Sequence, residues 1–328
     1  MKAFTSAPSV RTATSRLATL TAIVLAVHCT TATTSAAAAP LPQPTTDSAR
    51  YELTWADEFD VDGTPDPSRW TFEHGFVRNQ ELQWYQPDNA RCEGGLLKIT
   101  GRREQVANPR YEADSRDWRR NRRYAEYTSS CIESRRSFTF RYGRLEVKAR
   151  IPVAPGSWPA IWTLGNRGGW PACGEIDVME FYRVPPADVN IHHQARAERT
   201  VPVLLANACW QGANGRDAWN TGRWPFTRWT AEDADWASRF HTWRMDWTPE
   251  AIEIYLDDEL LNNIPTSQAD ADRPGYFNPF RNDIEGFGHY ILLNLAIGGC
   301  GGTPDDTAFP LVYEIDYVRV YERVGNNP

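Results

Sequence analysis

Three carboxylic acids, Glu175, Asp177 and Glu180, lie within six residues in the segment GEIDVMEFY (174–182). Apolar residues alternate with the first two acids, which is typical of a β-strand with one buried face. A buried charge without a partner costs several kcal/mol, so a strand that only fills a core has no use for such acids. Closely spaced acids are, however, what general acid–base and nucleophilic catalysis require.

The spacing of these acids indicates how they could act together. Side chains two residues apart share a face of a strand, so Glu175 and Asp177 point the same way, whereas Glu180 has the wrong parity. A β-bulge at 178–179 would restore Glu180 to that face. The two glutamate Cα atoms would then be roughly 13 Å apart, and their carboxyl groups could approach to about 5–6 Å, as in a retaining glycosidase. Asp177, between them, could hydrogen-bond the nucleophile and hold the two pKa values apart.

Short segments with period-two alternation of apolar and polar residues recur along the chain, separated by turn residues. The clearest is RLEVKARI (144–151), where Leu145, Val147 and Ala149 alternate with charged residues. Only the segment 232–240 has some helical character. Many short strands and few helices predict an all-β protein, an antiparallel sandwich.

The E-x-D-x-x-E pattern and its flanking segments resemble glycoside hydrolase family 16. The segments that carry the resemblance are GSWPAIWTLG (156–165), ELTWADEFD (52–60), NQELQWY (79–85), FHTWRMDWTPEAIEIYLDD (240–258) and YEIDYVRVYE (313–322). They follow the order of the family and span residues 51–323. The resemblance implies a jelly-roll sandwich of two curved antiparallel sheets, whose concave face forms a polysaccharide cleft.

Carried over to this sequence, the resemblance implies that Glu175 is the nucleophile, Glu180 the general acid/base and Asp177 an assisting residue, with no cofactor required for catalysis. The extra residue in the motif resembles the bulged, laminarinase-type branch. Two features depart from the family. NACW (207–210) replaces a frequent cleft histidine, with Cys209 near its position, and residues 105–124 form a long insertion.

Aromatic and polar residues outside the motif are candidates for sugar binding, because sugar C–H faces stack on indole rings. The chain has fourteen tryptophans, most of which core packing would explain. Trp158 and Trp162 flank the segment next to the catalytic strand and are predicted as platforms. Asn79, Glu81 and Trp84 match a family segment that reaches the glycone side of the cleft.

Metal and other hydrolase chemistries find little support in the sequence. The histidines form no metal-binding set, since the neighbours His192 and His193 would face opposite ways in a strand. The G-x-S-x-G and H-E-x-x-H motifs are absent from the sequence. Some members of the family carry a structural calcium on the convex face, with an aspartate that matches Asp316; a solvated strand acid is the alternative.

The chain begins like a secretory signal peptide, with Lys2, Arg11 and Arg16 before the apolar segment 17–27 and small residues at 34–40. We expect a signal peptide at 1–38, a linker at 39–50, one catalytic domain at 51–323 and a tail at 324–328. The apolar segment is too short to span a membrane. A lipoprotein anchored through Cys29 is disfavoured by the bulky His28, so the protein is expected to be secreted or periplasmic, and a monomer.

Charge and cysteine content add two expectations. Removal of the signal would take away three positive charges and change the net charge from −7 to −10, which disfavours a nucleic-acid partner. One basic segment, DWRRNRRY (117–124), is either a solvated loop or a contact for an anionic polymer. The mature chain would keep five cysteines, of which at least one must stay free, and Cys92 with Cys131 is the expected pair.

The expected activity is that of an endo-acting retaining β-glycanase, with β-1,3-glucan as the polysaccharide substrate. One alternative keeps the mechanism and takes a β-galactan, algal or host-derived, whose sulfate or sialate groups would suit the run of arginines at 119–123. A second alternative is a lectin on the same architecture, which fold alone does not exclude. A third is transglycosylation through the same covalent intermediate.

Overall fold

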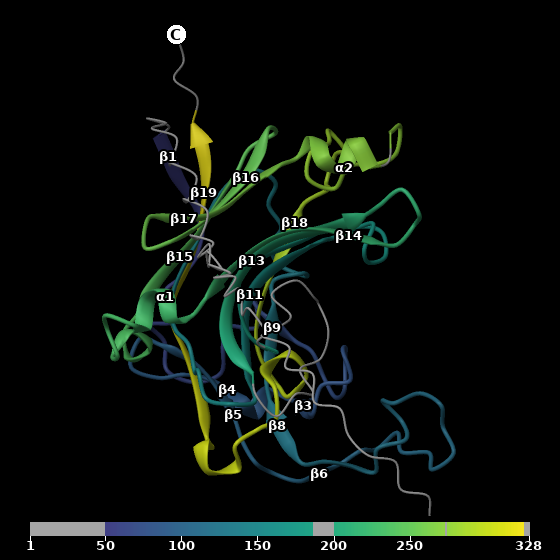
Figure 1. The fold of residues 1–328 in the computed structure, drawn as a ribbon, viewed down its shortest axis with the longest axis vertical. Coiled ribbons are helices and arrows are strands. Elements are labelled where there is room, and N and C mark those ends of the chain that lie inside the picture. Colours follow the sequence, from purple (N-terminus) through teal and green to yellow (C-terminus); the bar gives the residue numbers. More distant parts are fainter. Residues whose placement is uncertain (1–49, 186–199, 273, 325–328) are drawn as a thin grey trace, which may run out of the picture. The chain divides into compact units, whose positions relative to one another are not determined.

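A computed structural model describes residues 50–185, 200–272 and 274–324 (Figure 1). The expected signal peptide and His192 and His193 lie outside the described residues. Two antiparallel sheets make up most of the described chain, which confirms the predicted all-β sandwich. Within the described residues, no helix is both long and apolar enough to cross a membrane.

The first sheet has eight strands, in the order β17-β16-β15-β10-β19-β5-β4, with β1 paired to β19. Its strands are β1 (Arg50–Asp57), β4 (Ala90–Cys92), β5 (Leu97–Gly101), β10 (Gly143–Arg150), β15 (His241–Trp247), β16 (Ala251–Leu256), β17 (Glu259–Pro265) and β19 (Leu311–Val324).

The second sheet has seven strands, in the order β14-β13-β12-β11-β18-β9-β2. Its strands are β2 (Thr71–Phe72), β9 (Cys131–Glu133), β11 (Ser157–Gly165), β12 (Glu175–Val184), β13 (Val201–Gln211), β14 (Asp217–Pro225) and β18 (His289–Ile297). Figure 1 shows that β11 and β13 bend along their length.

Smaller elements border the two sheets. They are the parallel pair β3 (Gln83–Tyr85) and β8 (Tyr127–Ser129), the antiparallel pair β6 (Val106–Ala107) and β7 (Tyr124–Ala125), the short helices α1 (Thr227–Thr230) and α2 (Ser267–Asp272), and the 3-10 turns η1 (Pro87–Asn89), η2 (Trp236–Ser238), η3 (Gly299–Gly301) and η4 (Asp306–Ala308). The segment expected to have helical character contains only η2.

The core lies between the two sheets and follows from the alternation of side chains along their strands. In β10, Leu145, Val147 and Ala149 are buried, as the sequence predicted, and the residues between them are not. They belong to one buried cluster that also contains Ile161 of β11 and Ile291 of β18. The opposite face of the seven-stranded sheet carries two smaller buried clusters, one with Trp162 and one with Trp158, beside polar side chains.

The predicted bulge in β12 is confirmed. Asp177 pairs with Asn207 of β13, and Glu180 pairs with Leu205, so three steps along β12 oppose two along β13. The consecutive residues Val178 and Met179 both lie in the core cluster. The extra residue reverses the alternation and returns Glu180 to the face that carries Asp177.

The expected disulfide between Cys92 and Cys131 is wrong. Cys92 lies in β4 of the eight-stranded sheet and Cys131 in β9 of the seven-stranded sheet, and both are free. Cys173, Cys209 and Cys300 are free as well, so the cysteines of the described residues form no disulfide. The sequence placed both expected partners in strand-like segments but did not indicate that these segments belong to different sheets.

Candidate active site

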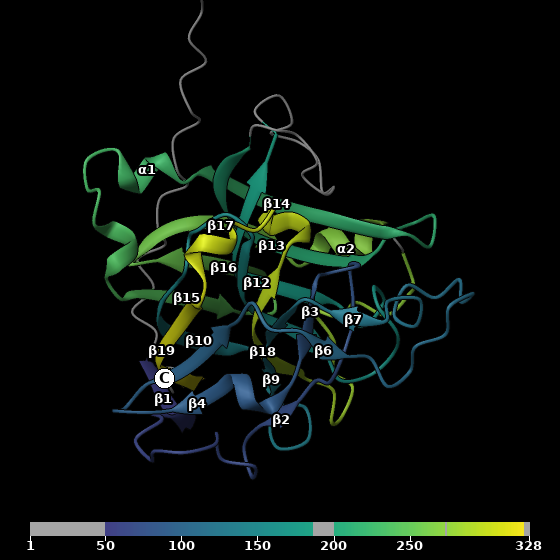
Figure 2. The same ribbon diagram turned by 90° about the horizontal axis from the view of Figure 1, so that it is seen from below.

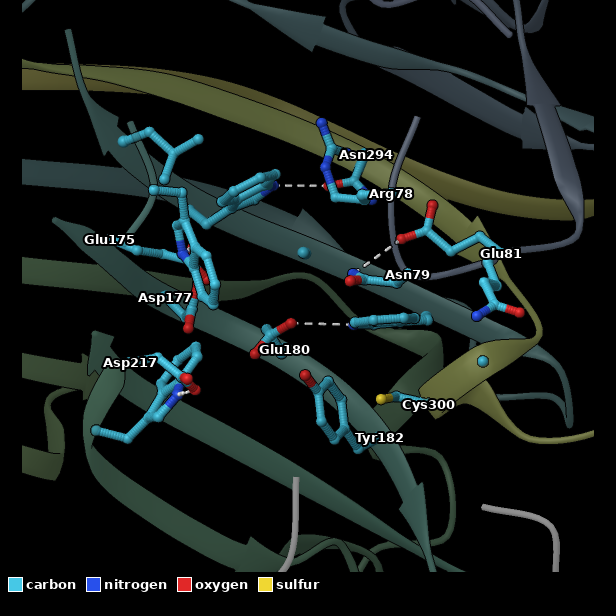
Figure 3. A pocket seen from close by; sticks show the side chains of 18 of the residues that line it. Arg78, Asn79, Glu81, Glu175, Asp177, Glu180, Tyr182, Asp217, Asn294 and Cys300 are labelled. Carbon is cyan, nitrogen blue, oxygen red and sulfur yellow. Dashed lines mark hydrogen bonds between the residues drawn. The ribbon is translucent and has the colours of Figure 1, made fainter. Parts of the chain in front are cut away.

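A cleft of about 670 Å³ lies on the outer face of the seven-stranded sheet. Side chains of β11, β12, β14 and β18 line it, together with residues 78–81 and the loop after β18. In Figure 3, Glu175, Asp177 and Glu180 point into a common space, with Arg78 and Glu81 on one side and Asp217 on the other.

The three acids of the motif all line this cleft but differ in exposure. Glu175, at the start of β12, is partly exposed, whereas Asp177 and Glu180 are 1% and 8% exposed. Burial raises the pKa of Glu175 to about 7. Burial and the neighbouring charge of Glu175 raise the pKa of Glu180 to about 8. Both glutamates therefore keep a proton to a higher pH than an exposed glutamate does.

Asp177 lies between the two glutamates and is the most buried of the three. Its pKa is raised well above the ordinary value by burial and then by the charges of Glu180 and Glu175. It is hydrogen-bonded to Glu175, and this bond lowers the pKa of Glu175. A protonated Asp177 therefore acts as a donor to Glu175 and stabilises the ionised form of that glutamate.

Three side chains from three strands hold the carboxylate of Glu180. The indole nitrogen of Trp158 donates to its Oε1 at 3.0 Å, and the amide of Asn207 donates to its Oε2 at 3.2 Å. The side chain of Tyr182 is also hydrogen-bonded to Glu180 and lowers its pKa. Asn207 reaches Asp177 as well, with 3.4 Å between the amide nitrogen and Oδ2.

The segment NACW (207–210) lies where the family often has a histidine, and it contributes the amide of Asn207 to the cleft acids. In the register of β13, Cys209 pairs with Glu175 and Asn207 pairs with Asp177. Cys209 is fully buried and its pKa is raised, first by burial, so the thiol stays protonated beneath the site. The sequence drew attention to Cys209, but the side chain that bonds the acids is Asn207.

Trp170, which the sequence did not single out, is bonded to Glu175. Its indole nitrogen donates to Glu175 Oε2 at 2.7 Å, and this bond lowers the pKa of Glu175. The side chain lines the cleft and is 52% exposed. A large indole that is exposed beside the Glu175 carboxylate is available to contact a ligand in the cleft.

The predicted sugar platforms Trp158 and Trp162 both line the cleft and are 6% and 7% exposed. Besides the bond of Trp158 to Glu180, the indole nitrogen of Trp162 donates to Asn294 Oδ1 at 2.7 Å. The guanidinium carbon of Arg78 lies 5.0 Å from the centre of the Trp162 ring. Both rings are therefore held in fixed orientations at the base of the cleft.

The predicted residues before and within β3 have different surroundings. Asn79 and Glu81 line the cleft, and the Asn79 amide donates to Glu81 Oε1 at 3.2 Å. The Gln83 amide donates to the other oxygen of Glu81 at 2.6 Å. Trp84 instead packs edge-on against Phe76, with 5.4 Å between the ring centres. Asn79 and Glu81 precede the strand, whereas Trp84 lies within β3 and is not among the residues that line the cleft.

The other side of the cleft is formed by Asp217 and Trp219 at the start of β14. The indole nitrogen of Trp219 donates to Asp217 Oδ2 at 2.7 Å. The glycine-rich segment 298–302, which follows β18, contributes Gly299 and Cys300 to the cleft. None of these residues belongs to a recognisable motif, so only the fold brings them to the acids.

The residues around Asp316 do not fit a calcium site. Lys148 Nζ lies 2.6 Å from Asp316 Oδ2, so an ammonium group occupies the position that a cation would need. In the described part of the chain, no cluster of three or more His, Cys, Asp or Glu residues could hold a metal ion.

Comparison with known proteins assigns the family. The family model described as glycosyl hydrolases family 16 matches residues 100–283. The β-glucanase of Rhodothermus marinus is 34% identical over 289 residues, which cover 84% of this chain and 86% of that protein.

Two solved structures share this fold over most of both chains. The laminarinase of Rhodothermus marinus superposes with a TM-score of 0.61 at 32% identity, covering 85% of this chain and all of that one. A structure from work on endo-acting O-glycanases, which human gut microbiota express to initiate mucin breakdown, superposes with a TM-score of 0.69 at 32% identity. It covers 86% of this chain and 94% of the other. The match to the family model and the similarity over nearly the whole domain mean that the chain belongs to glycosyl hydrolases family 16.

Proposed function

We propose that this protein is an endo-acting β-1,3-glucanase that cleaves its polysaccharide with retention of configuration. The observation that carries this proposal is the bulge in β12, because it brings two glutamates with different surroundings onto one face of a cleft. The named relatives support the substrate, since they include a β-glucanase and a laminarinase.

In the proposed reaction, Glu180 is the general acid and Glu175 the nucleophile. A raised pKa lets Glu180 remain protonated and donate its proton to the leaving glycosidic oxygen. Glu175 then attacks the anomeric carbon with its carboxylate and forms a glycosyl-enzyme ester. Water hydrolyses this ester with Glu180, now ionised, as the general base.

The bonds around the acids support these roles. Trp170 and Asp177 both donate to Glu175, which favours the ionised form that attacks. Trp158 and Asn207 hold both oxygens of Glu180, so its orientation is fixed while its proton is transferred. We infer that Trp170 and Asn207 are positioning residues for the two glutamates.

A second candidate is cleavage of a host O-glycan. The structure from work on mucin-degrading O-glycanases favours it, because its TM-score of 0.69 exceeds the 0.61 of the laminarinase at equal identity. The catalytic steps would be the same, and only the sugars bound in the cleft would differ.

A product assay on the purified protein tests both candidates. The panel contains laminarin, mixed-linkage β-glucan, agarose, porphyran and mucin glycans, and the Glu175→Gln variant is the control. Oligosaccharides from laminarin that the control does not release would support the glucanase. Products from mucin glycans or a galactan alone would replace the proposed substrate and keep the mechanism.

Two other results would reject hydrolysis as the main activity. Binding of a polymer without any product would favour a lectin. Transfer products that exceed hydrolysis products would favour a transglycosylase, because the same ester can react with a sugar hydroxyl.

A further inference from the structure

The insertion at residues 105–124 has an ordered internal framework. Its ends are joined by the β6–β7 pair. Asn108, which is 5% exposed, donates from its amide nitrogen to the carbonyl oxygens of Arg119 and Arg122, each at 2.8 Å. Its own Oδ1 accepts a bond from the backbone of Arg110 at 3.0 Å. A buried amide that uses both donor and acceptor fixes the path of the loop around it.

Two arginines connect this insertion to the loop before β3. Figure 2 shows β3 beside β6 and β7, the strands at the ends of the insertion. Arg119 donates from Nε and Nη2 to the carbonyl oxygen of Val77, at 3.0 and 2.8 Å. Arg122 donates to the carbonyl oxygens of Gln80, at 2.8 Å, and Glu81. The planar guanidinium groups therefore hold both ends of the loop that carries the cleft residues.

These bonds matter because the loop adopts an unfavourable backbone conformation. Asn79 and Gln80 both have φ of +54°, in the left-handed region that non-glycine residues rarely adopt. Both line the cleft, together with Glu81. A segment of this kind keeps its shape only when its surroundings hold it, and the carbonyl bonds from the insertion do so.

The arginine run is therefore used within the protein. Besides Arg119 and Arg122, Arg120 forms an ion pair with Glu112, and the guanidinium carbon of Arg123 lies 5.4 Å from the centre of the Tyr124 ring. Two of the four arginines thus bond backbone carbonyls of the loop before β3, which gives the run a structural role within the protein.

Trp118 is the point at which the insertion reaches the cleft. It is half-buried, and of residues 105–124, all of which the structure describes, it is the one that lines the cleft. Its ring centre lies 5.9 Å from that of Phe76, and the guanidinium carbons of Arg119 and Arg122 lie 4.8 and 5.1 Å from it. An indole held in this way presents rigid apolar area to the cleft.

We propose that Trp118 forms an additional sugar-binding position, and that Arg119 and Arg122 position both this residue and the loop before β3. Its contact with Phe76 places Trp118 beside the loop that carries Asn79 and Glu81. Figure 3 shows that Asn79 and Glu81 lie across the cleft from Asp217. The proposal rests on the proposed endo-glycanase function. It predicts that the insertion sets the length of chain that the enzyme binds best.

The test compares Trp118→Ala with Tyr111→Ala, which removes another aromatic side chain of the insertion that is 41% exposed. Hydrolysis of β-1,3-linked oligosaccharides of increasing length and of laminarin is measured for both variants and the wild type. Binding of the same series is measured by calorimetry in the Glu175→Gln background, and melting temperatures check folding. Arg119→Gln and Arg122→Gln are examined in the same way.

Loss of one stacked ring predicts that Trp118→Ala raises KM on the order of tenfold for laminarin and long oligosaccharides, with kcat unchanged. Short oligosaccharides that do not reach Trp118 should show no change, and Tyr111→Ala should match the wild type throughout. The two arginine variants should lose affinity for the long chains more than for the short ones.

An equal loss at every chain length would overturn the proposal, because it would reduce Trp118 to a support of the loop. Unchanged binding of long chains by Trp118→Ala would overturn it as well. If the wild type neither binds nor cleaves any member of the series, the proposed glucanase function fails, and that result is distinct from the other two.

Discussion

The bond between Trp170 and Glu175 gives a quantitative prediction for Trp170→Phe. The substitution removes the indole donor, which lies 2.7 Å from Glu175 Oε2, and keeps an aromatic ring. A hydrogen bond to a charged group contributes about 1.5–3 kcal/mol. Because the Trp170 side chain is 52% exposed, water can replace part of the bond, so the lower end of this range applies. That loss corresponds to about 1 pKa unit.

The direction of the shift follows from the form that the bond stabilises. The indole N–H favours the carboxylate, so its removal raises the pKa of Glu175 further above the value of about 7. Since Glu175 must be ionised to attack, the acid limb of kcat/KM should move up by about 1 pH unit. The basic limb, assigned to Glu180, should stay in place, so the pH profile becomes narrower and its maximum lower.

The assay is the pH dependence of kcat/KM on a soluble oligosaccharide, measured for the wild type and the variant. Trp219→Phe is the matched control, because its indole donates to Asp217 in the same cleft and not to a catalytic acid. Its acid limb should coincide with that of the wild type. An acid limb of Trp170→Phe within about 0.3 unit of the wild type would refute the role of this bond.

Three further predictions concern the acid/base side of the site. Glu180→Gln should lose most activity on polysaccharide and recover part of it on aryl glycosides, whose leaving groups need no proton; equal losses on both would contradict the acid role. At pH 8 the same variant should melt on the order of 10 °C above the wild type, and near pH 4 the two proteins should melt at the same temperature. The reason is that the pKa of Glu180 in the folded protein, about 8, exceeds the ordinary value of 4.5, so the stability that the bound proton provides is lost as the pH rises from 4.5 to 8. A higher melting temperature of the variant at both pH values would exclude this cause. Asn207→Ala removes a donor at 3.2 Å from Glu180, so the basic limb of kcat/KM should rise by about 0.5–1 unit, and an unchanged limb would make Asn207 a packing residue.

The positions of the three acids on β12 could be predicted from the sequence for a physical reason. The acids are close in the chain, and their positions relative to one another depend only on strand alternation and one inserted residue. The order of polar and apolar residues in the sequence indicates both the strand alternation and the inserted residue. The break in alternation at Val178 and Met179, which leaves Glu180 with the wrong parity, was therefore sufficient to predict the bulge that the structure contains.

Two of the partners of the acids were harder to predict because one comes from another strand and one from a loop. Asn207 reaches Glu180 through the pairing of β12 with β13, and Trp170 reaches Glu175 from the loop before β12. Asparagine and tryptophan are common, and nothing in their local sequence distinguishes a donor to a catalytic acid from a surface or core residue. The same limitation produced the incorrect disulfide, whose two cysteines lie in different sheets.

The sequence by itself determined the all-β class, the family and the three acids of the motif, since period-two alternation and a short motif are local properties. Only the tertiary structure decided which donors hold each acid, that the arginines bond the backbone of the loop before β3, and that Trp118 faces the cleft. These features depend on strand register and on contacts between segments about 40 residues apart or more, such as Arg119 with Val77 and Arg122 with Gln80. Local patterns of polar and apolar residues do not record such contacts.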